Sequence, residues 1–130
     1  MNIKRLVYEA VMYIHNNFSE PISVDDVSAH VNFSTSYFAA VFRVLTGFTV
    51  KRYVNNYRLH CAATELVEGD KRIADIAFET GFSSQQTFTK NFSKAYGMAP
   101  AQFRQLKPEF EPFPPNGLWK EQVALNYMPV

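Results

Sequence analysis

Residues 27–47 read VSAHVNFSTSYFAAVFRVLTG and residues 76–97 read IAFETGFSSQQTFTKNFSKAYG, so the chain contains nearly the same segment twice. The Phe-Ser pair at residues 33–34 returns at residues 82–83, an offset of 49. Three later positions return at an offset of 50, which places one added residue just past each serine: Phe38, Phe42 and Gly47 correspond to Phe88, Phe92 and Gly97. A repeated short helix, tight turn and second helix predicts a doubled helix-turn-helix, a motif that lays its second helix in the DNA major groove.

The composition is that of a small protein with its own hydrophobic core. A chain of 130 residues forms one domain or two very small ones, and 47% of its residues are hydrophobic. No apolar run approaches the ~20 residues that a membrane span needs. Cys61 is the single cysteine, which excludes an internal disulfide. We therefore expect a cytoplasmic protein without a membrane partner.

The charge is unevenly distributed. The net charge is +1, but residues 1–107 hold 12 Lys/Arg against 9 Asp/Glu, whereas residues 108–130 hold one Lys and three Glu. An acidic tail therefore masks a mildly basic body, which gives weak support to DNA binding.

The apolar spacing and the capping residues predict an all-α fold of about seven helices. Ser23 and Asp26 open the second helix, Ser34 opens the third, and Gly47 ends it. In the second repeat, Ser83 is expected to cap the recognition helix, with Gln86 partly engaged in a capping box. The other expected helices cover roughly 3–17, 49–66 and 73–80, and a last short helix begins at Pro100 and ends near Leu106; the second helix ends near Val31, and Gly97 ends the recognition helix of the second repeat.

The fourth helix is expected to link the two repeats. Eighteen residues at 1.5 Å each give a length of about 27 Å. Its buried side is predicted to comprise Val50, Tyr53, Val54, Tyr57, Cys61, Ala62 and Leu66. The paired phenylalanines of the repeats are expected in the core.

The C-terminal tail differs from the rest of the chain. Residues 108–130 are acidic and rich in proline, which predicts an extended linker. Val123, Leu125 and Tyr127 alternate as in a β-strand, and a lone strand needs a partner to be stable. The tail therefore docks on the helical body or belongs to something outside this chain.

The motifs of the second repeat resemble the AraC/XylS signature: Ile73-Ala74-Asp75-Ile76-Ala77, Gly81-Phe82-Ser83-Ser84-Gln85, Phe88, Phe92, Gly97, Pro100 and Phe103-Arg104. Arg58-Leu59, Ala62 and Leu66 match the linking helix of that family, and the chain is most similar to its short MarA, SoxS and Rob subgroup. The resemblance implies a bacterial transcription regulator with a DNA-binding domain at 1–107. This domain would comprise a first helix-turn-helix subdomain at 1–48, a linking helix at 49–68 and a second subdomain at 69–107.

In the second recognition helix, the base-contacting positions of the family fall on Gln85, Gln86, Thr89 and Lys90. Glutamine can pair bidentately with adenine, lysine can donate to guanine, and threonine can offer a hydroxyl or touch a thymine methyl. The other interpretation of these residues is a solvated polar face. Within this repeat, DNA contact is the favoured interpretation.

In the first recognition helix, the corresponding positions fall on Ser36, Ala39 and Ala40, which departs from the subgroup's pattern of large polar residues. Alanine can only touch a thymine methyl or permit a close approach. We therefore expect the second unit to specify sequence and the first mostly to anchor or to read DNA shape. The small residues of the first helix could instead meet a protein.

Phosphate contacts are expected from basic and hydroxyl side chains near helix ends. The candidates are Thr35, Arg43, Lys51, Arg52, Lys71, Arg72, Thr87 and Lys94. Arg58 is expected to brace the two units through Glu65 or Asp75, with a position along phosphate as the alternative.

No catalytic or metal-binding pattern is present in the sequence. His15, His30 and His60 lack metal-ligand spacing, and the adjacent His60 and Cys61 should face different ways on a helix. We expect a protein that is not an enzyme and has no cofactor.

The leading hypothesis is a sequence-specific regulator that binds double-stranded promoter DNA as a monomer. The resemblance implies an activator that recruits RNA polymerase. Two alternatives stay open: a protein-interaction module that titrates a regulator, and the DNA-binding fragment of a longer effector-responsive regulator whose further domain starts near Trp119.

Overall fold

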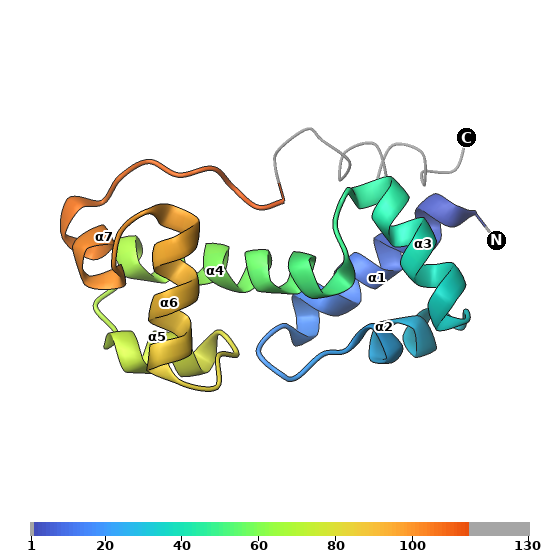
Figure 1. Ribbon diagram of the computed structural model, residues 1–130, viewed down its shortest axis with the longest axis horizontal. Helices are drawn as coiled ribbons and strands as arrows, with labels where there is room; N and C mark the ends of the chain where they lie inside the picture. Colours follow the sequence, from blue (N-terminus) through green and yellow to red (C-terminus); the bar gives the residue numbers. More distant parts are fainter. Residues whose placement is uncertain (1, 115–130) are drawn as a thin grey trace.

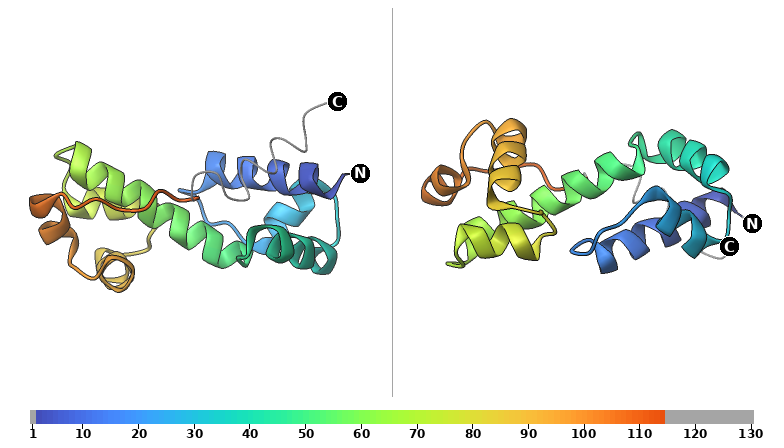
Figure 2. Two further views of the ribbon diagram at one scale, coloured as in Figure 1. Left: turned by 90° about the horizontal axis from the view of Figure 1, so that it is seen from above. Right: turned by 60° about the horizontal axis from the view of Figure 1, so that its bottom comes forward.

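The computed structural model describes residues 2–114, which form seven α-helices as the sequence predicts (Figure 1). Two helical units lie toward opposite ends of the long helix α4, and the molecule is elongated along that helix (Figures 1 and 2). The helices are α1 Ile3–Asn17, α2 Val24–Val31, α3 Thr35–Thr46, α4 Val50–Glu68, α5 Ile73–Glu79, α6 Gln85–Tyr96 and α7 Pro100–Leu106. None of the helices within residues 2–114 combines the length and apolar character that crossing a bilayer requires.

The first helix-turn-helix, α2–α3, has the predicted helix boundaries. A capping box joins Ser23 and Asp26 at the start of α2, and the hydrogen bond that the Ser23 amide donates to the Asp26 carboxylate lowers the pKa of that carboxyl. Asn32 adopts φ 63° and turns the chain. Ser34 caps α3, and Gly47 ends α3 in the left-handed conformation at φ 81°.

The second helix-turn-helix, α5–α6, begins its recognition helix one residue later than predicted. Ser84, not Ser83, is the N-cap, and its hydroxyl accepts from the amide of Thr87. The third helical position is therefore Thr87, so the expected capping box with Gln86 is wrong. The turns are otherwise alike, because the amides of Phe33 and Phe82 each donate to a carbonyl five residues back.

Helix α4 supplies one side of its surface to each of two hydrophobic cores. Its N-terminal half packs Val50, Tyr53 and Val54 against α1–α3, and its C-terminal half packs Leu59, Ala62, Ala63 and Leu66 against α5–α7. At 100° per residue these two stripes lie on nearly opposite sides of the helix. The paired Phe38, Phe42, Phe88 and Phe92 are fully buried, as predicted.

The predicted buried side of α4 is wrong at two positions. Tyr57 and Cys61 lie on the same side of α4 as the first stripe but are only partly buried, and Tyr57 packs against the first core. The prediction also missed Leu59 and Ala63, which are buried in the second core beside the correctly predicted Ala62 and Leu66.

Arg58 braces the two units at the middle of α4. Its Nε and Nη2 donate to the carbonyl oxygens of Phe18 and Glu20, both at 2.8 Å. The guanidinium also lies against the turn of the second unit, because a Cβ at Gly81 would come 2.8 Å from Arg58 Nε. The predicted bracing therefore uses backbone carbonyls, and the expected partners Glu65 and Asp75 pair with lysine and arginine instead.

The described part of the tail, residues 108–114, lies along α4 and contacts both cores (Figure 1). The Phe110 ring centroid lies 5.5 Å from that of Phe103, and the Phe113 centroid lies 5.0 Å from that of Tyr53. This segment is extended, as expected, but it docks on the helices. The predicted strand near Val123 and the proposed start of a further domain near Trp119 lie outside the described residues.

Candidate nucleic-acid interface

Four predicted base-contacting residues come together on the outer face of α6. Gln85, Gln86 and Lys90 are exposed and Thr89 is partly exposed. Together with Ser93 they line one shallow hollow. No hydrogen bond or ion pair within residues 2–114 engages Gln86 or Lys90, so both side chains are available to an incoming partner.

The matching face of α3 is nearly apolar. At the repeat offset of 50, Ser36, Ala39 and Ala40 correspond to Gln86, Thr89 and Lys90. Ser36 and Ala40 are exposed, and Ala39 is partly buried. The sequence analysis missed two exposed residues of α3: Val44, 81% exposed, and Tyr37, 47% exposed. The signal for Val44 was its position four residues after Ala40, on the same face of the helix.

Several predicted phosphate-contacting cations lie between or beside the two recognition helices. Lys51 and Arg52 are exposed at the first turn of α4. Both line a groove of about 810 Å³ that reaches from α2 to Asn91 of α6. Arg43 is exposed on α3, and Lys94 is exposed in the last turn of α6. These four cations are therefore exposed and accessible to a partner.

The other two predicted phosphate-contacting cations are paired with carboxylates. Lys71 Nζ lies 3.2 Å from Glu79 and 3.9 Å from Glu65, and these neighbours raise the pKa of the Lys71 ammonium. Arg72 Nε lies 2.9 Å from Asp75, whose carboxylate raises the pKa of the guanidinium. To contact a phosphate, Lys71 or Arg72 would have to break its ion pair with a carboxylate or contact both groups at once.

The two predicted threonine contacts also have internal partners. Thr35 Oγ1 donates to Asp25 at 2.7 Å and lies 3.0 Å from the Ser28 hydroxyl. The Thr87 hydroxyl lies 3.0 Å from that of its N-cap, Ser84. Thr87 itself is exposed beside the turn of the second unit, so its second lone pair and its methyl stay accessible.

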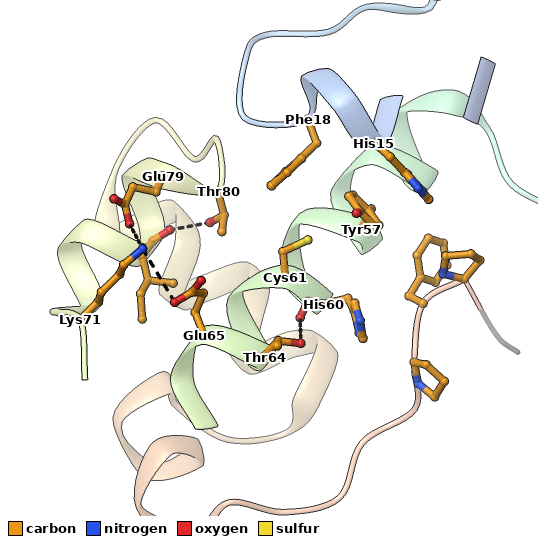
Figure 3. A pocket seen from close by; sticks show the side chains of 14 residues that line it. His15, Phe18, Tyr57, His60, Cys61, Thr64, Glu65, Lys71, Glu79 and Thr80 are labelled. Carbon is orange, nitrogen blue, oxygen red and sulfur yellow. Dashed lines mark hydrogen bonds and ion pairs between the residues drawn. The ribbon is translucent and has the colours of Figure 1, made fainter. Parts of the chain in front are cut away.

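A cavity of about 560 Å³ borders Tyr57, His60 and Cys61 of α4 (Figure 3), whereas Asn55 and Arg58 of the same helix line the groove described above. His15 and Tyr57 stack at 4.0 Å between ring centroids, and burial raises the pKa of Tyr57 to about 12. Its lining comprises His15, Phe18, Tyr57, His60, Cys61, Thr64, Glu65, Lys71, Ile76, Glu79, Thr80, Pro112, Phe113 and Pro114. Lys71 therefore lines this cavity and does not line the groove that holds Arg52.

His60 and Cys61 both border the cavity, but their side chains point in different directions, as the sequence predicts (Figure 3). Burial raises the pKa of the Cys61 thiol and lowers that of the His60 imidazole, which opposes the thiolate form that a nucleophile needs. Among residues 2–114, no group of three or more His, Cys, Asp and Glu residues could hold a metal ion.

Two helix-turn-helix units on one linking helix, with a polar recognition face and cations beside it, define a DNA-binding protein. The model of a helix-turn-helix domain family matches residues 27–106. The chain belongs to the AraC family of sequence-specific DNA-binding transcription regulators of bacteria, which are not enzymes.

Curated relatives include short and long proteins. The regulatory protein SoxS of Escherichia coli K12 is 30% identical over 104 residues, which cover 80% of this chain and 97% of SoxS. The melibiose operon regulatory protein of the same strain is 31% identical over 103 residues, which cover 79% of this chain and 34% of that protein. The chain therefore spans about a third of the length of this second relative.

The fold is also similar to that of solved structures. The DNA-binding domain of AdpA, a global transcriptional factor crystallised in complex with a target DNA, is 25% identical with a TM-score of 0.73. The match covers 77% of this chain and 90% of that domain.

Proposed function

We propose that this chain binds promoter DNA as a monomer, with α3 and α6 in successive major-groove segments on one face of the duplex and α6 supplying most of the base readout. The observation that carries the proposal is the unpaired polar face of α6, where Gln85, Gln86, Thr89 and Lys90 gather on one hollow. These side chains can read adenine and guanine edges in the major groove.

The dimensions of α4 support the use of two grooves. Nineteen residues make α4 about 28 Å long, which is compatible with major-groove segments about 34 Å apart on one face. The hydrogen bonds of Arg58 and the docked tail segment restrain the units at the middle of this helix. A restrained spacing lowers the ordering cost of binding both segments together.

The phosphate contacts divide into two groups by availability. Arg43, Lys51, Arg52 and Lys94 are exposed near the recognition helices, so we assign them the main backbone contacts. Lys71 and Arg72 are assigned a smaller role, because each already pairs with a carboxylate. Neutralising each phosphate releases a counterion, so affinity should fall steeply as the salt concentration rises.

We further propose that the chain acts as an activator that recruits RNA polymerase in the cytoplasm. The similarity to AraC-family regulators supports this role. In vitro transcription with purified RNA polymerase tests it directly. Added protein should increase transcript from a promoter that carries the bound site, and a decrease or no change contradicts activation.

A protein-interaction module is the second candidate function. The apolar surface that Val44 forms with Ala40 favours it, because contiguous exposed apolar patches mark protein-interaction sites. A binding module would show no steep salt dependence with any duplex, which separates the two functions. The further proposal that the chain is part of a longer effector-responsive regulator rests on the long relatives.

Selection of bound fragments from a random duplex pool tests the DNA-binding proposal and identifies the site. On the selected site, Gln86→Ala and Lys90→Ala should each weaken binding by about 1–3 kcal/mol and relax preference at the base that they read. Gln102→Ala, at an exposed position of α7, is the matched control and should bind like the parent. If the two α6 variants also bind like the parent, the assignment of the reading face is wrong.

A further inference from the structure

The two recognition helices present chemically different faces at equivalent positions. On α6, the residues at intervals of four are Gln86, Lys90 and Lys94, all exposed. On α3, the equivalent residues are Ser36, Ala40 and Val44, also exposed. Val44 is 81% exposed, the largest exposure among the large hydrophobic residues of the described chain. Where α6 carries polar and charged side chains, α3 therefore carries side chains that are more apolar toward its C-terminal end.

The apolar stripe of α3 borders a hollow of about 650 Å³ between α3 and the start of α4. Its walls are formed by the side chains of Ala39, Ala40, Val44 and Val50, with Val24 of α2. Arg43, Lys51 and the hydroxyl-bearing Thr49 also line it, and none of its lining residues is a carboxylate. A molecule bound in this hollow would therefore contact an apolar surface flanked by two cationic side chains.

This combination suits a major groove rather than a protein partner. A groove carries phosphates along both edges, which would meet Arg43 and Lys51, while the base edges between them meet the apolar surface. In the major groove, the thymine C5-methyl is the apolar group of the base edges. A small apolar side chain also permits the close helix approach that methyl contact requires.

We propose that α3 reads thymine through its methyl group, with Ala40 and Val44 as the specificity-determining residues of the first DNA segment. The inference rests on the proposed function, because it requires α3 to enter the major groove. The inference goes further than the proposed function because it assigns a base preference to the first unit. If α3 contacted only the DNA backbone, the first segment would show no base preference. Two contacts of this kind would favour thymine-rich sequence in that segment only.

Replacement of thymine by deoxyuridine tests the proposal, because it removes the methyl and keeps the hydrogen-bonding edge. On the selected site, deoxyuridine at a contacted position of the α3 segment should weaken binding of the full chain about fourfold, the equivalent of about 0.8 kcal/mol per buried methyl. The α6 segment is identified as the one whose base preference changes in Lys90→Ala.

Val44→Ala is the matched variant, since a side chain exposed to this degree can be shortened without loss of the fold, which thermal unfolding verifies. The uridine penalty at the position read by Val44 should shrink toward onefold in Val44→Ala. The same substitution should leave the effects of base changes in the α6 segment as they are in the parent.

Three outcomes overturn the proposal. If duplexes with deoxyuridine in the α3 segment bind with full affinity, while Gln86 and Lys90 are still required for binding, methyl reading is rejected and the proposed function stays intact. An unchanged uridine penalty in Val44→Ala rejects Val44 as the reader. If the parent protein shows no salt-sensitive binding to any duplex, both proposals are rejected and a protein partner is favoured for this face.

Discussion

Gly81→Ala tests how closely the two units approach each other. Gly81 has φ +94°, and a Cβ there would lie 2.9 Å from the carbonyl oxygen of Phe18 and 2.8 Å from Arg58 Nε. The Arg58 side chain can move aside, but the Phe18 oxygen belongs to the backbone of the other unit. The methyl group must therefore push the units apart or break the Arg58 hydrogen bond.

The expected cost has two parts. A left-handed backbone costs a non-glycine residue about 1–2 kcal/mol. Loss of the charged hydrogen bond from Arg58 to Phe18 adds about 1.5–3 kcal/mol. Gly81→Ala should therefore lower the free energy of unfolding by about 2.5–5 kcal/mol. Gly47→Ala and Gly97→Ala are matched controls, because their φ values are +81° and +75° and an added Cβ would contact nothing within 4 Å.

Urea denaturation of the three variants and the parent provides the measurement. The controls should each lose only the backbone cost of about 1–2 kcal/mol. The Gly81 variant should also lose DNA affinity beyond its loss of stability, since the spacing of α3 and α6 changes with the unit interface. A Gly81→Ala protein no less stable than the two controls would refute the close approach and, with it, the bracing role of Arg58.

Three further predictions concern the tail, the core and pH. Phe113→Ala should lower the unfolding free energy by about 1–3 kcal/mol, because the ring packs on Phe48 and Tyr53; unchanged urea unfolding would contradict docking of the tail. Phe92→Ala should cost about 3–5 kcal/mol and unfold the second unit, which calorimetry would show as a lost or strongly shifted transition. Burial lowers the pKa of His60 below 6.5, so the folded protein favours the neutral ring and loses stability as pH falls from about 6.5 through the folded-state pKa. The slope of stability against pH in this range should flatten in His60→Gln, and an identical slope would exclude His60 as its source.

The fold could be predicted because the local signals agree with one another. The two phenylalanine pairs mark the core of each repeat, while Asn32 and Gly47 supply the left-handed residues that end α2 and α3. Ser84 was missed because two adjacent serines can each cap a helix, and only the backbone geometry of the turn selects between them.

Features that depend on long-range packing were less predictable. The buried side of α4 changes between Tyr57 and Leu59, where the helix passes from the first core to the second. A single helical periodicity along the whole of α4 cannot describe this change. The partners of Arg58 are backbone carbonyls, whose positions are set by the turn after α1. Docking of Phe113 on the first core likewise joins residues far apart in the sequence.

The exposed polar face of α6 was predictable because exposure follows from helical spacing once the core residues are known. Gln86 and Lys90 fall opposite Phe88 and Phe92, which are buried. The ion pairs of Lys71 with Glu65 and Glu79 depend on the fold, so its availability to DNA could not be judged from charge alone.

A hydroxyl-radical and methylation-interference footprint on the selected duplex is the most direct test of two-groove binding by one chain. We expect two protected segments about one helical turn apart on the same face, with interference from guanine N7 methylation, which lies in the major groove, concentrated in the segment that α6 contacts. Protection limited to a single groove segment, at a protein-to-DNA ratio of one to one, would contradict the account.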